Sequence, residues 1–535
     1  MRLYAGITIG PIFDAISNAT IPAALWFASY LFSDLSRRLC AEVKACVSGA
    51  EIVSPCYEET DENDGVGKYH DRIILYTDAY SSERELQEAT REAVETVRAD
   101  TARKGPDAIF PEHAFAAQEP DAFAKSATYL RRYLQIHTAV LSEKAIGGEN
   151  CVLALSSCLD ALELMRTFPG DNQYDPFRFM FANQSVIYNA GNLLIKQSGL
   201  FPEKDNFLVN REGNIRSVPD IARTSQTPNL KRECYYAVVY ADGDNLTSFL
   251  NGLKTPSHIR RFSKGCLAYD RKAARRISAY GGMPVYAGGD DLLFLAPLSG
   301  QNGQSVASFC QSLRNLFLDT LREEFADEDA SGFAFPTMSF GVAVQFEKFP
   351  LYEAFERARQ LLKMAKSGEK DNILLELRKH SGQSAALLIH NPDAQAFEEL
   401  CKAARGDDVD GEKPTALLYT LEHFHAVVSV LIANARKRLE AGEHPDALKE
   451  EFLSAWGNLF DNPGQTVSEE YAKGVGEAYF TRLLSGNGGV TVPGHAAPGG
   501  FFDNSLKALV NVLTWEKFMK EKASEQERAE AGKKP

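Results

Sequence analysis

The sequence predicts an α+β protein with two ferredoxin-like units, a mainly helical region between them and a helical bundle after the second. Two observations predict this. The order strand, helix, strand, strand, helix occurs near the N-terminus, and the same order with one more strand returns from Tyr235. The 535 residues, 44% of them hydrophobic, can form about three or four domains of roughly 150 residues each. We place these domains at residues 1–105, 106–225, 226–385 and 386–535.

The first unit begins with the apolar strand "RLYAGITIG", and a helical periodicity follows from Pro22 to Val43. "AEIVSPCY" and "RIILYTDA" are expected as two further strands, separated by a polar loop. A charged amphipathic helix then extends from about Ser82 to Lys104. This order is typical of a ferredoxin-like unit.

The region after the first unit reads mostly as helix, in "AFAKSATYLRRYLQIHTAVL" and "ALSSCLDALELMRTF". The second unit then repeats the strand and helix order. Its expected elements are the strand "YYAVVYADGDN", a helix over 259–280, the hairpin "MPVYAGGDDLLFLAP", a helix over 304–325, the strand "TMSFGVAVQF", the helix "LYEAFERARQLLKMAKSG" and the strand "DNILLELRK". From about Ala386 the chain is expected to be helical.

Charge and cysteine content narrow the classes of function. The formal net charge is -14, whereas a protein that grips bare nucleic acid over a wide face is usually basic. Any nucleic-acid contact should therefore be local, for example at Arg260-Arg261 or from Lys272 to Arg276, although both stretches could equally be solvated helix faces.

The nine cysteines are an odd number without a CxxC pair, which indicates reduced thiols in the cytoplasm and no zinc site. The N-terminus lacks the pattern of a signal peptide, and the apolar stretch "PAALWFASYLF" is too short to span a bilayer. We expect a cytoplasmic protein without a membrane partner.

The stretch "VYAGGDDLLFLAP" carries the first chemical signal. Gly288 and Gly289 can take the positive φ angles that a tight hairpin needs, and their missing side chains let backbone N–H groups approach a phosphate. A plain acidic hairpin turn would show the same four residues, so Asp290 and Asp291 need a second observation.

The strand "VVYADGDNL" supplies that observation. Asp242 ends this strand and Asp244 lies two positions on, hence on the same face. In a ferredoxin-like sheet the first strand and the central hairpin are neighbours, so Asp242 should meet Asp290 and Asp291 at one end of the sheet. Carboxylates crowded in this way repel each other unless cations neutralise them. We therefore predict a Mg²⁺ or Mn²⁺ site, because two such ions can activate a ribose 3′-hydroxyl and steady a leaving pyrophosphate.

Together, "YYAVVYADGDN", "VYAGGDDLLFL", "MSFGVAVQ" and "YEAFERARQLLKMAK" resemble the palm polymerase-cyclase domain of the large subunit of type III CRISPR effector complexes, particularly the Cmr-type branch. That domain is akin to GGDEF diguanylate cyclases and adenylyl cyclases. The segment "ITIGPIFDAISNATIPAALWFASYLFSDL" is similar to the first, degenerate palm of that subunit. The resemblance covers most of the chain and implies two palm domains, an intervening helical domain and a C-terminal helical bundle.

The resemblance implies catalytic roles for the acids of the second unit. Asp242 and Asp290 would be the leading metal ligands, and Asp291 would support metal binding or 3′-hydroxyl activation. Asp244 would join them as a metal ligand.

The resemblance also implies nucleotide contacts. Gly288 and Gly289 would lie against the phosphates, and Lys366 matches the lysine that GGDEF-like domains place against the triphosphate. Ser339 lies where the family's strand passes near the base, although an ordinary strand serine is an equal alternative. Lys370 stands near the family's arginine position, but the spacing differs and no role is assigned to it.

The chain also departs from the family pattern. Many relatives begin with an HD nuclease domain, whereas this sequence begins at the first palm, so we expect an HD-less subunit. His70-Asp71 is an HD dipeptide, but it introduces a strand without partner histidines. The cysteine zinc motif of many relatives is missing as well, and no zinc is expected.

The resemblance implies a target-RNA-triggered nucleotidyltransferase that makes a second messenger from ATP in antiviral defence. The product would be a cyclic oligoadenylate by default, or an AMP conjugate of S-adenosylmethionine. Partners would be the backbone, guide-end cap and small helical subunits, with guide and target RNA. Two alternatives remain: a catalytically quiet structural subunit of the same complex, and a stand-alone GGDEF-type cyclase.

Overall fold

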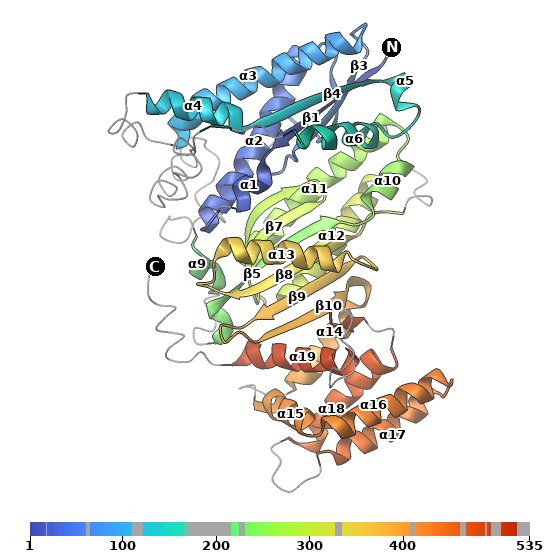
Figure 1. Ribbon diagram of the computed structural model, residues 1–535. Coiled ribbons are helices and arrows are strands. Elements are labelled where there is room, and N and C mark those ends of the chain that lie inside the picture. Colours follow the sequence, from blue (N-terminus) through green and yellow to red (C-terminus); the bar gives the residue numbers. More distant parts are fainter. Residues whose placement is uncertain are drawn as a thin grey trace.

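The computed structural model shows an elongated α+β molecule, with a four-stranded sheet at one end, a seven-stranded sheet in the middle and helices at the other end (Figure 1). The residues that the structure describes are 1–17, 19–59, 65–109, 121–165, 169–170, 216–223, 230–326, 334–406, 412–460, 467–486, 489–493 and 504–521. About half of the region expected as a helical domain, 106–225, lies outside these residues.

The four-stranded sheet has the strand order β2-β3-β1-β4, and all neighbouring strands are antiparallel. This is the order of a ferredoxin-like sheet. Its strands are β1 (Leu3–Gly10), β2 (Glu51–Ser54), β3 (Arg72–Thr77) and β4 (Gln135–Ser142). The neighbouring helices are α1 (Ile12–Ser17), α2 (Pro22–Cys46), α3 (Glu83–Ile109), α4 (Ala122–Tyr133), α5 (Glu143–Ile146) and α6 (Cys151–Glu163).

The predicted boundary of the first unit at residue 105 is wrong, because the fourth strand comes later in the chain. The stretch expected as one helix divides at Leu134, where α4 ends and β4 begins. β4 pairs with β1 along its whole length, from Gln135 opposite Gly10 to Ser142 opposite Leu3. The alternating β-branched residues of "QIHTAV" are the signal for this strand.

The seven-stranded sheet has the order β11-β10-β9-β8-β5-β7-β6. β8 and β9 are parallel, and the other neighbours are antiparallel. Its strands are β5 (Tyr235–Gly243), β6 (Met283–Gly288), β7 (Asp291–Pro297), β8 (Met338–Phe346), β9 (Asn372–Arg378), β10 (Ser384–His390) and β11 (Val490–Thr491). The helices along it are α9 (Val218–Ala222), α10 (Leu246–Gly252), α11 (Pro256–Tyr280), α12 (Val306–Glu324) and α13 (Leu351–Ala365).

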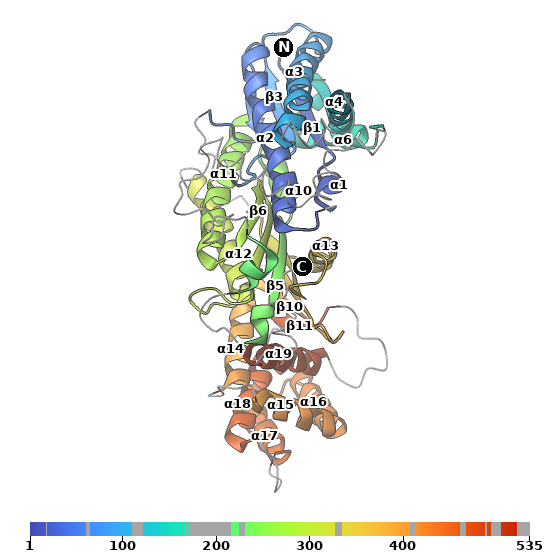
Figure 2. The ribbon, with the colours of Figure 1, turned by 90° about the vertical axis from the view of Figure 1, so that its left-hand side faces the viewer.

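Two apolar cores hold the sheets together. α11 and α12 cover one face of the seven-stranded sheet and α13 covers the other (Figure 2). α2 of the N-terminal unit packs in the same core as α13, through buried residues such as Trp26 and Phe27. The two sheets therefore share a core, so a shift of one is felt by the other.

The C-terminal part is helical, but the expected boundary at 386 is also wrong. "SAALLIH", at that boundary, forms β10 and pairs with β9. The sequence did not predict this strand, because the periodicity of a short apolar run does not distinguish a strand from a helix. The helices are α14 (Ala394–Arg405), α15 (Glu412–His423), α16 (His425–Glu440), α17 (Pro445–Asn458), α18 (Glu469–Tyr479) and α19 (Asn504–Lys520). Over the described ranges no single helix is long and apolar enough to cross a membrane. The pair Lys413–His423 and His425–Glu440, bent by 84°, meets that criterion only when both are taken together.

Candidate active site

The Gly-Gly-Asp-Asp stretch forms a two-residue hairpin turn between β6 and β7. Gly288 pairs with Asp291, which leaves Gly289 and Asp290 as the loop. Gly289 has a φ of 77°, a conformation that favours glycine. At Gly288 a Cβ atom would lie 2.5 Å from the Tyr286 hydroxyl oxygen. The turn itself therefore favours glycine at Gly289. The positive φ expected at Gly288 is not found, and glycine there instead leaves room for the Tyr286 side chain.

Three carboxylates of the predicted site meet at this turn. Ala241 pairs with Leu292, and continuing this register by one residue places Asp242 beside Asp291. The charge of Asp242 acts on both Asp290 and Asp291, so the three carboxylates lie close together. The structure thus brings the acids of the two sequence segments together at one end of the β5–β7 pair.

Loss of surrounding water dominates the electrostatics of the turn, although Asp290 and Asp291 keep some exposure to the cleft. Burial and then the charge of Asp242 raise the pKa of Asp290 to about 7. The same two causes raise the pKa of Asp291 well above its ordinary value. Asp290 and Asp291 therefore keep their protons to a higher pH than ordinary aspartates do.

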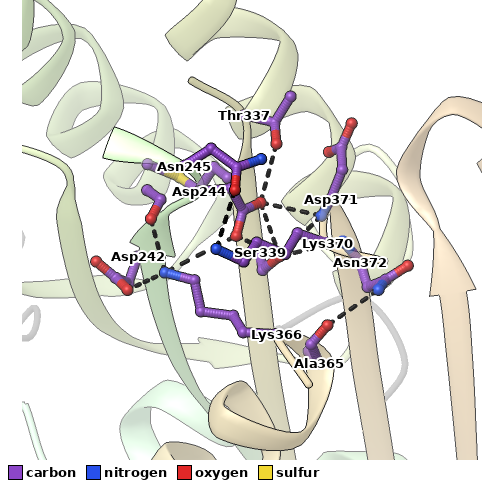
Figure 3. A network of polar contacts seen from close by, with 12 residues as sticks. Asp242, Asp244, Asn245, Thr337, Ser339, Ala365, Lys366, Lys370, Asp371 and Asn372 are labelled. Atoms are coloured by element: carbon purple, nitrogen blue, oxygen red, sulfur yellow. Dashed lines mark hydrogen bonds and ion pairs between the residues drawn. The ribbon is translucent and has the colours of Figure 1, made fainter. Parts of the chain in front are cut away.

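Lys366 supplies positive charge to the place where the acidic turn meets the end of β5, which is called the corner below. It caps the C-terminus of α13, and its ammonium group donates hydrogen bonds to the Asp242 carboxylate and, at 2.7 Å, to the Gly243 carbonyl oxygen. The ammonium lies 3.8 Å from Asp244 Oδ1. Figure 3 shows Lys366 reaching across from its helix to the end of β5.

Glycine contacts set the distances in this corner. A Cβ atom on Gly243 would lie 2.7 Å from Asp290 Oδ2, so the bare backbone makes room for that carboxylate. A Cβ atom on Gly341 of β8 would collide with the backbone of Ala358 and Leu362 in α13. Gly341 therefore lets α13 lie close enough to the sheet for Lys366 to reach Asp242.

Asp244 and Ser339 have a different role from the predicted one. Both side chains are fully buried, and Ser339 Oγ donates to Asp244 Oδ2 at 2.8 Å. Asp244 Oδ2 also accepts from Thr337 Oγ1 at 2.9 Å and from the Asp371 backbone N–H at 3.0 Å (Figure 3). These bonds tie the end of β5 to β8 and to the start of β9. The expectations of a metal ligand at Asp244 and of a base contact at Ser339 do not fit this geometry.

The network includes a residue to which the sequence assigned no role. Lys370 Nζ donates to Asn245 Oδ1 at 3.0 Å, and Asn245 has a positive φ of 56° directly after Asp244. Asp270 on α11 was not predicted either. It is buried, and its Oδ2 accepts a hydrogen bond from the Gly289 N–H at 3.1 Å, which fixes the turn against α11. No sequence signal separates Asp270 from the other charged residues of its helix.

A cleft of about 390 Å³ opens beside the turn and is lined from both units. Gly288, Gly289, Asp290 and Asp291 form one wall. The N-terminal unit contributes, among others, His70 and its neighbours, and further lining residues come from α6, α10 and α11. The cleft thus extends from the acidic turn into the space between the two units.

His70 and Asp71 therefore lie near the candidate site. His70 Nε2 and Ser54 Oγ are 3.0 Å apart, and His70 Cδ2 lies 3.5 Å from the position of a Cβ atom on Gly289. Burial lowers the pKa of His70 to about 4, so its ring is neutral near pH 7. Burial raises the pKa of Asp71 to about 6. Both residues of the dipeptide line this cleft. Their position before a strand in the sequence did not predict it.

Among the described residues, no group of three or more His, Cys, Asp or Glu side chains is arranged to hold a metal ion. The corner still favours a cation, because the Lys366 ammonium lies against Asp242 and the Gly243 carbonyl. Asp242, Asp290 and this carbonyl offer the oxygen ligands that Mg²⁺ prefers, and Mg²⁺ commonly takes its remaining ligands from water and phosphates. The residues fit a divalent ion that is completed by a nucleotide.

Comparison with known proteins identifies the unit that carries this site. Residues 235–374 match the family model "Cas10/Cmr2, second palm domain". The chain carries a Cas10/Cmr2-type second palm domain. The match begins at the first residue of β5 and ends within β9, so this second palm domain includes the acidic turn, Lys366 and the Asp244 network.

Relatives of the second palm domain point the same way. The CRISPR system Cmr subunit Cmr2 of Pyrococcus furiosus is 24% identical over 251 residues, which are 42% of this chain and 26% of the relative. This chain thus spans about a quarter of the length of the curated relative that it matches. The predicted resemblance to Cas10/Cmr2-type large subunits is confirmed.

Solved structures share the fold beyond the second palm domain. A type III-B Cmr-beta complex in its apo state contains a chain with a TM-score of 0.58 at 12% identity, covering 96% of this chain and 82% of that one. A Csm1-Csm4 cassette in complex with pppApA gives a TM-score of 0.50 at 11% identity, covering 91% of this chain and 69% of that one. At these identities the likeness is one of fold.

Proposed function

We propose that this chain is the large subunit of a type III CRISPR effector complex. Its second palm domain would use ATP as the substrate to synthesise a nucleotide second messenger when target RNA binds. The observation that carries the proposal is the meeting of Asp242, Asp290 and Asp291 at a glycine turn, with Lys366 beside them. Acids held close together with raised pKa values cost stability, so a function is the simplest reason for their presence.

Each residue of the corner has a role in this proposal. Asp242 and Asp290 would hold Mg²⁺ or Mn²⁺, which would supply charge neutralisation for the attacking hydroxyl and the leaving pyrophosphate. Asp291, whose pKa is also raised, supports metal binding or takes the proton of the 3′-hydroxyl. Lys366, which pairs with Asp242 in this structure, would contact the triphosphate when a nucleotide binds.

The turn and the buried network act as the frame. Gly288 and Gly289 leave room for phosphates beside the backbone, while the Gly289 N–H donates to Asp270 and holds the turn in shape. Asp244 and Ser339 hold the ends of three strands in register. In this proposal the N-terminal sheet is the first palm, which closes the other side of the cleft.

The partners belong to the same proposal. The neighbouring structures are a Cmr-beta complex and a Csm1-Csm4 cassette, and the relative is a Cmr subunit. We propose that this chain assembles with the backbone, guide-end cap and small helical subunits of such a complex around guide RNA and target RNA. The nucleotide product is a cyclic oligoadenylate or an AMP conjugate of S-adenosylmethionine.

The test uses the assembled complex with ATP, Mg²⁺ and target RNA, with and without S-adenosylmethionine, and identifies the products by mass spectrometry. The change Asp290→Ala with Asp291→Ala should abolish product while the complex still assembles, because both acids line the cleft. The control is Asp78→Asn, which changes an exposed acid of the N-terminal unit paired with Arg2. Undiminished product from the double variant would refute the assignment of the turn.

A further inference from the structure

A second cleft, of about 1000 Å³, lies in the N-terminal unit between α3, α4, the edge strand β4 and the end of α6. It shares no lining residue with the cleft beside the acidic turn. Its charged lining residues are Arg91, Glu95 and Arg98 of α3 and Arg131 and Arg132 of α4.

The arrangement gathers positive charge from two helices. Arg91, Glu95 and Arg98 are spaced to share one face of α3. Glu95 pairs with Arg98 at 3.0 Å and also with Arg131, so one carboxylate holds two guanidinium groups from different helices side by side. The lining thus holds four guanidinium groups and one carboxylate, in a chain whose net charge is -14.

The basic stretches singled out in the sequence are engaged elsewhere. Arg260 pairs with Glu51 at 3.2 Å, and Lys272 pairs with Glu323 at 3.0 Å. Arg276 donates to the Ser312 carbonyl oxygen. Acids and backbone groups thus contact these residues of both stretches, whereas the lining of the cleft on α3 and α4 gathers four arginines around one acid.

The chemistry of the lining indicates the class of ligand. All its cations are arginines, whose planar forks match phosphate oxygens. Neutral polar groups of Thr128, Gln135 and His137 lie among them and suit ribose hydroxyls. Burial and the charge of Arg98 lower the pKa of His137, so its ring is neutral near pH 7. The apolar part of the lining consists of Val94, Leu134, Ile136, Leu162 and Met165.

We propose that this cleft binds the sugar–phosphate backbone of single-stranded RNA. An acidic protein segment would also attract arginines, but the neutral hydrogen-bonding groups suit ribose hydroxyls, which such a segment lacks. The inference goes beyond nucleotidyl transfer and does not depend on it. It gives the N-terminal unit a direct contact with RNA at a place separate from the acidic turn.

The test measures the anisotropy of a fluorescein-labelled single-stranded RNA titrated with the purified full chain at several salt concentrations. The change Arg91→Ala with Arg132→Ala should weaken binding about tenfold and lower the slope of log affinity against log salt by about 1.4, since each phosphate contact contributes about 0.7. The matched control is Arg84→Ala with Arg103→Ala, which removes the same charge from exposed positions 88% and 74% accessible on α3. The control should keep the affinity and slope of the unchanged chain.

The remaining outcomes overturn the proposal. Equal losses in both double variants would show a general charge effect, and no RNA binding by the unchanged chain at the lowest salt would refute the site. Competition by a poly-glutamate peptide as strong as that of unlabelled RNA would assign the cleft to an acidic protein. Thermal melting of each variant separates lost binding from lost fold. The readout is RNA binding alone, so failure here leaves the test of product formation untouched.

Discussion

At the scale of the residue, Asp290 shows how burial and a neighbouring charge change the pKa of an acid in the site. Its pKa is raised from an ordinary 3.8 to about 7 by burial and by the charge of Asp242. The folded protein therefore binds this proton more tightly than the unfolded chain does. The stabilisation is complete below the ordinary pKa and is lost as the pH rises through about 7.

This sign gives the first prediction. Without divalent metal, the melting temperature of the protein should fall by a few degrees between about pH 5 and about pH 8, and Asp290→Asn should flatten that fall because the amide does not titrate. Differential scanning fluorimetry over this range measures it. Asp78→Asn is the control and should keep the full slope, because Asp78 is exposed. An Asp290→Asn profile as steep as that of the unchanged protein would contradict the pKa assignment.

The sequence predicted the meeting of the turn acids with Asp242, since strand register alone brings them together. It failed for Asp244 and Ser339, because whether a carboxylate faces a cleft or a buried hydroxyl depends on neighbours distant in the chain. It also gave no role to Asp270, whose bond to the Gly289 amide joins segments from two elements. Single residues whose function rests on tertiary contacts leave no local pattern.

At the scale of the element, the position of α13 depends on Gly341. The helix lies so close to β8 that a side chain there would strike the backbone of Ala358 and Leu362, which cannot move aside as a side chain could. Lys366 stands at the end of this helix. The packing of one helix therefore sets the reach of the lysine toward Asp242.

The second prediction follows from this contact. Gly341→Ala should destabilise the protein by about 1–3 kcal/mol or more, as overpacking does, and should lower product formation further than the loss of folded protein explains. Gly474→Ala is the control: no heavy atom lies within 4 Å, Gly474 lies inside α18, and alanine should stabilise that helix by about 0.5–1 kcal/mol. Urea unfolding and product yield per folded molecule measure both effects. Equal stability of Gly341→Ala and the unchanged protein would show that α13 is free to shift.

The sequence predicted elements correctly where the hydrophobic periodicity was long, and the prediction failed where it was short. The helices now seen as α11 and α12 were predicted to within a few residues, whereas β4 and β10 were expected as helix. Each of these strands completes or extends a sheet that begins far away in the chain. Pairing with another strand, distant in the chain for β4 and directly preceding for β10, decides the structure of such short segments.

At the scale of the whole molecule, the segment 65–71 joins the N-terminal unit to the acidic turn. The Gly67 carbonyl oxygen accepts the Ala287 N–H at 2.9 Å, which adds a bridge beside β6. α2 holds the segment from the other side: Trp26 Nε1 donates to the Gly65 carbonyl oxygen at 2.6 Å. Ser36 Oγ donates to the His70 carbonyl oxygen at 2.7 Å. A rearrangement of the N-terminal unit can therefore displace the acidic turn through this series of hydrogen bonds.

The third prediction tests this connection. A Cβ atom on Gly67 would lie 3.1 Å from Ser33 Cβ and 3.2 Å from Tyr286 Cδ2, so the methyl groups of Gly67→Val should push α2 and β6 apart. We expect faster hydrogen exchange at the Ala287 amide and a product yield lowered about tenfold, with the remaining protein still folded, because a small displacement of reacting groups costs rate steeply. Hydrogen exchange with mass spectrometry and product assays on the assembled complex measure the two effects. Gly368→Ala, which meets no atom within 4 Å, should change neither. Exchange at Ala287 that stays slow in Gly67→Val while product falls would place the effect elsewhere, whereas a joint change would show that the N-terminal unit sets the geometry of the acidic turn.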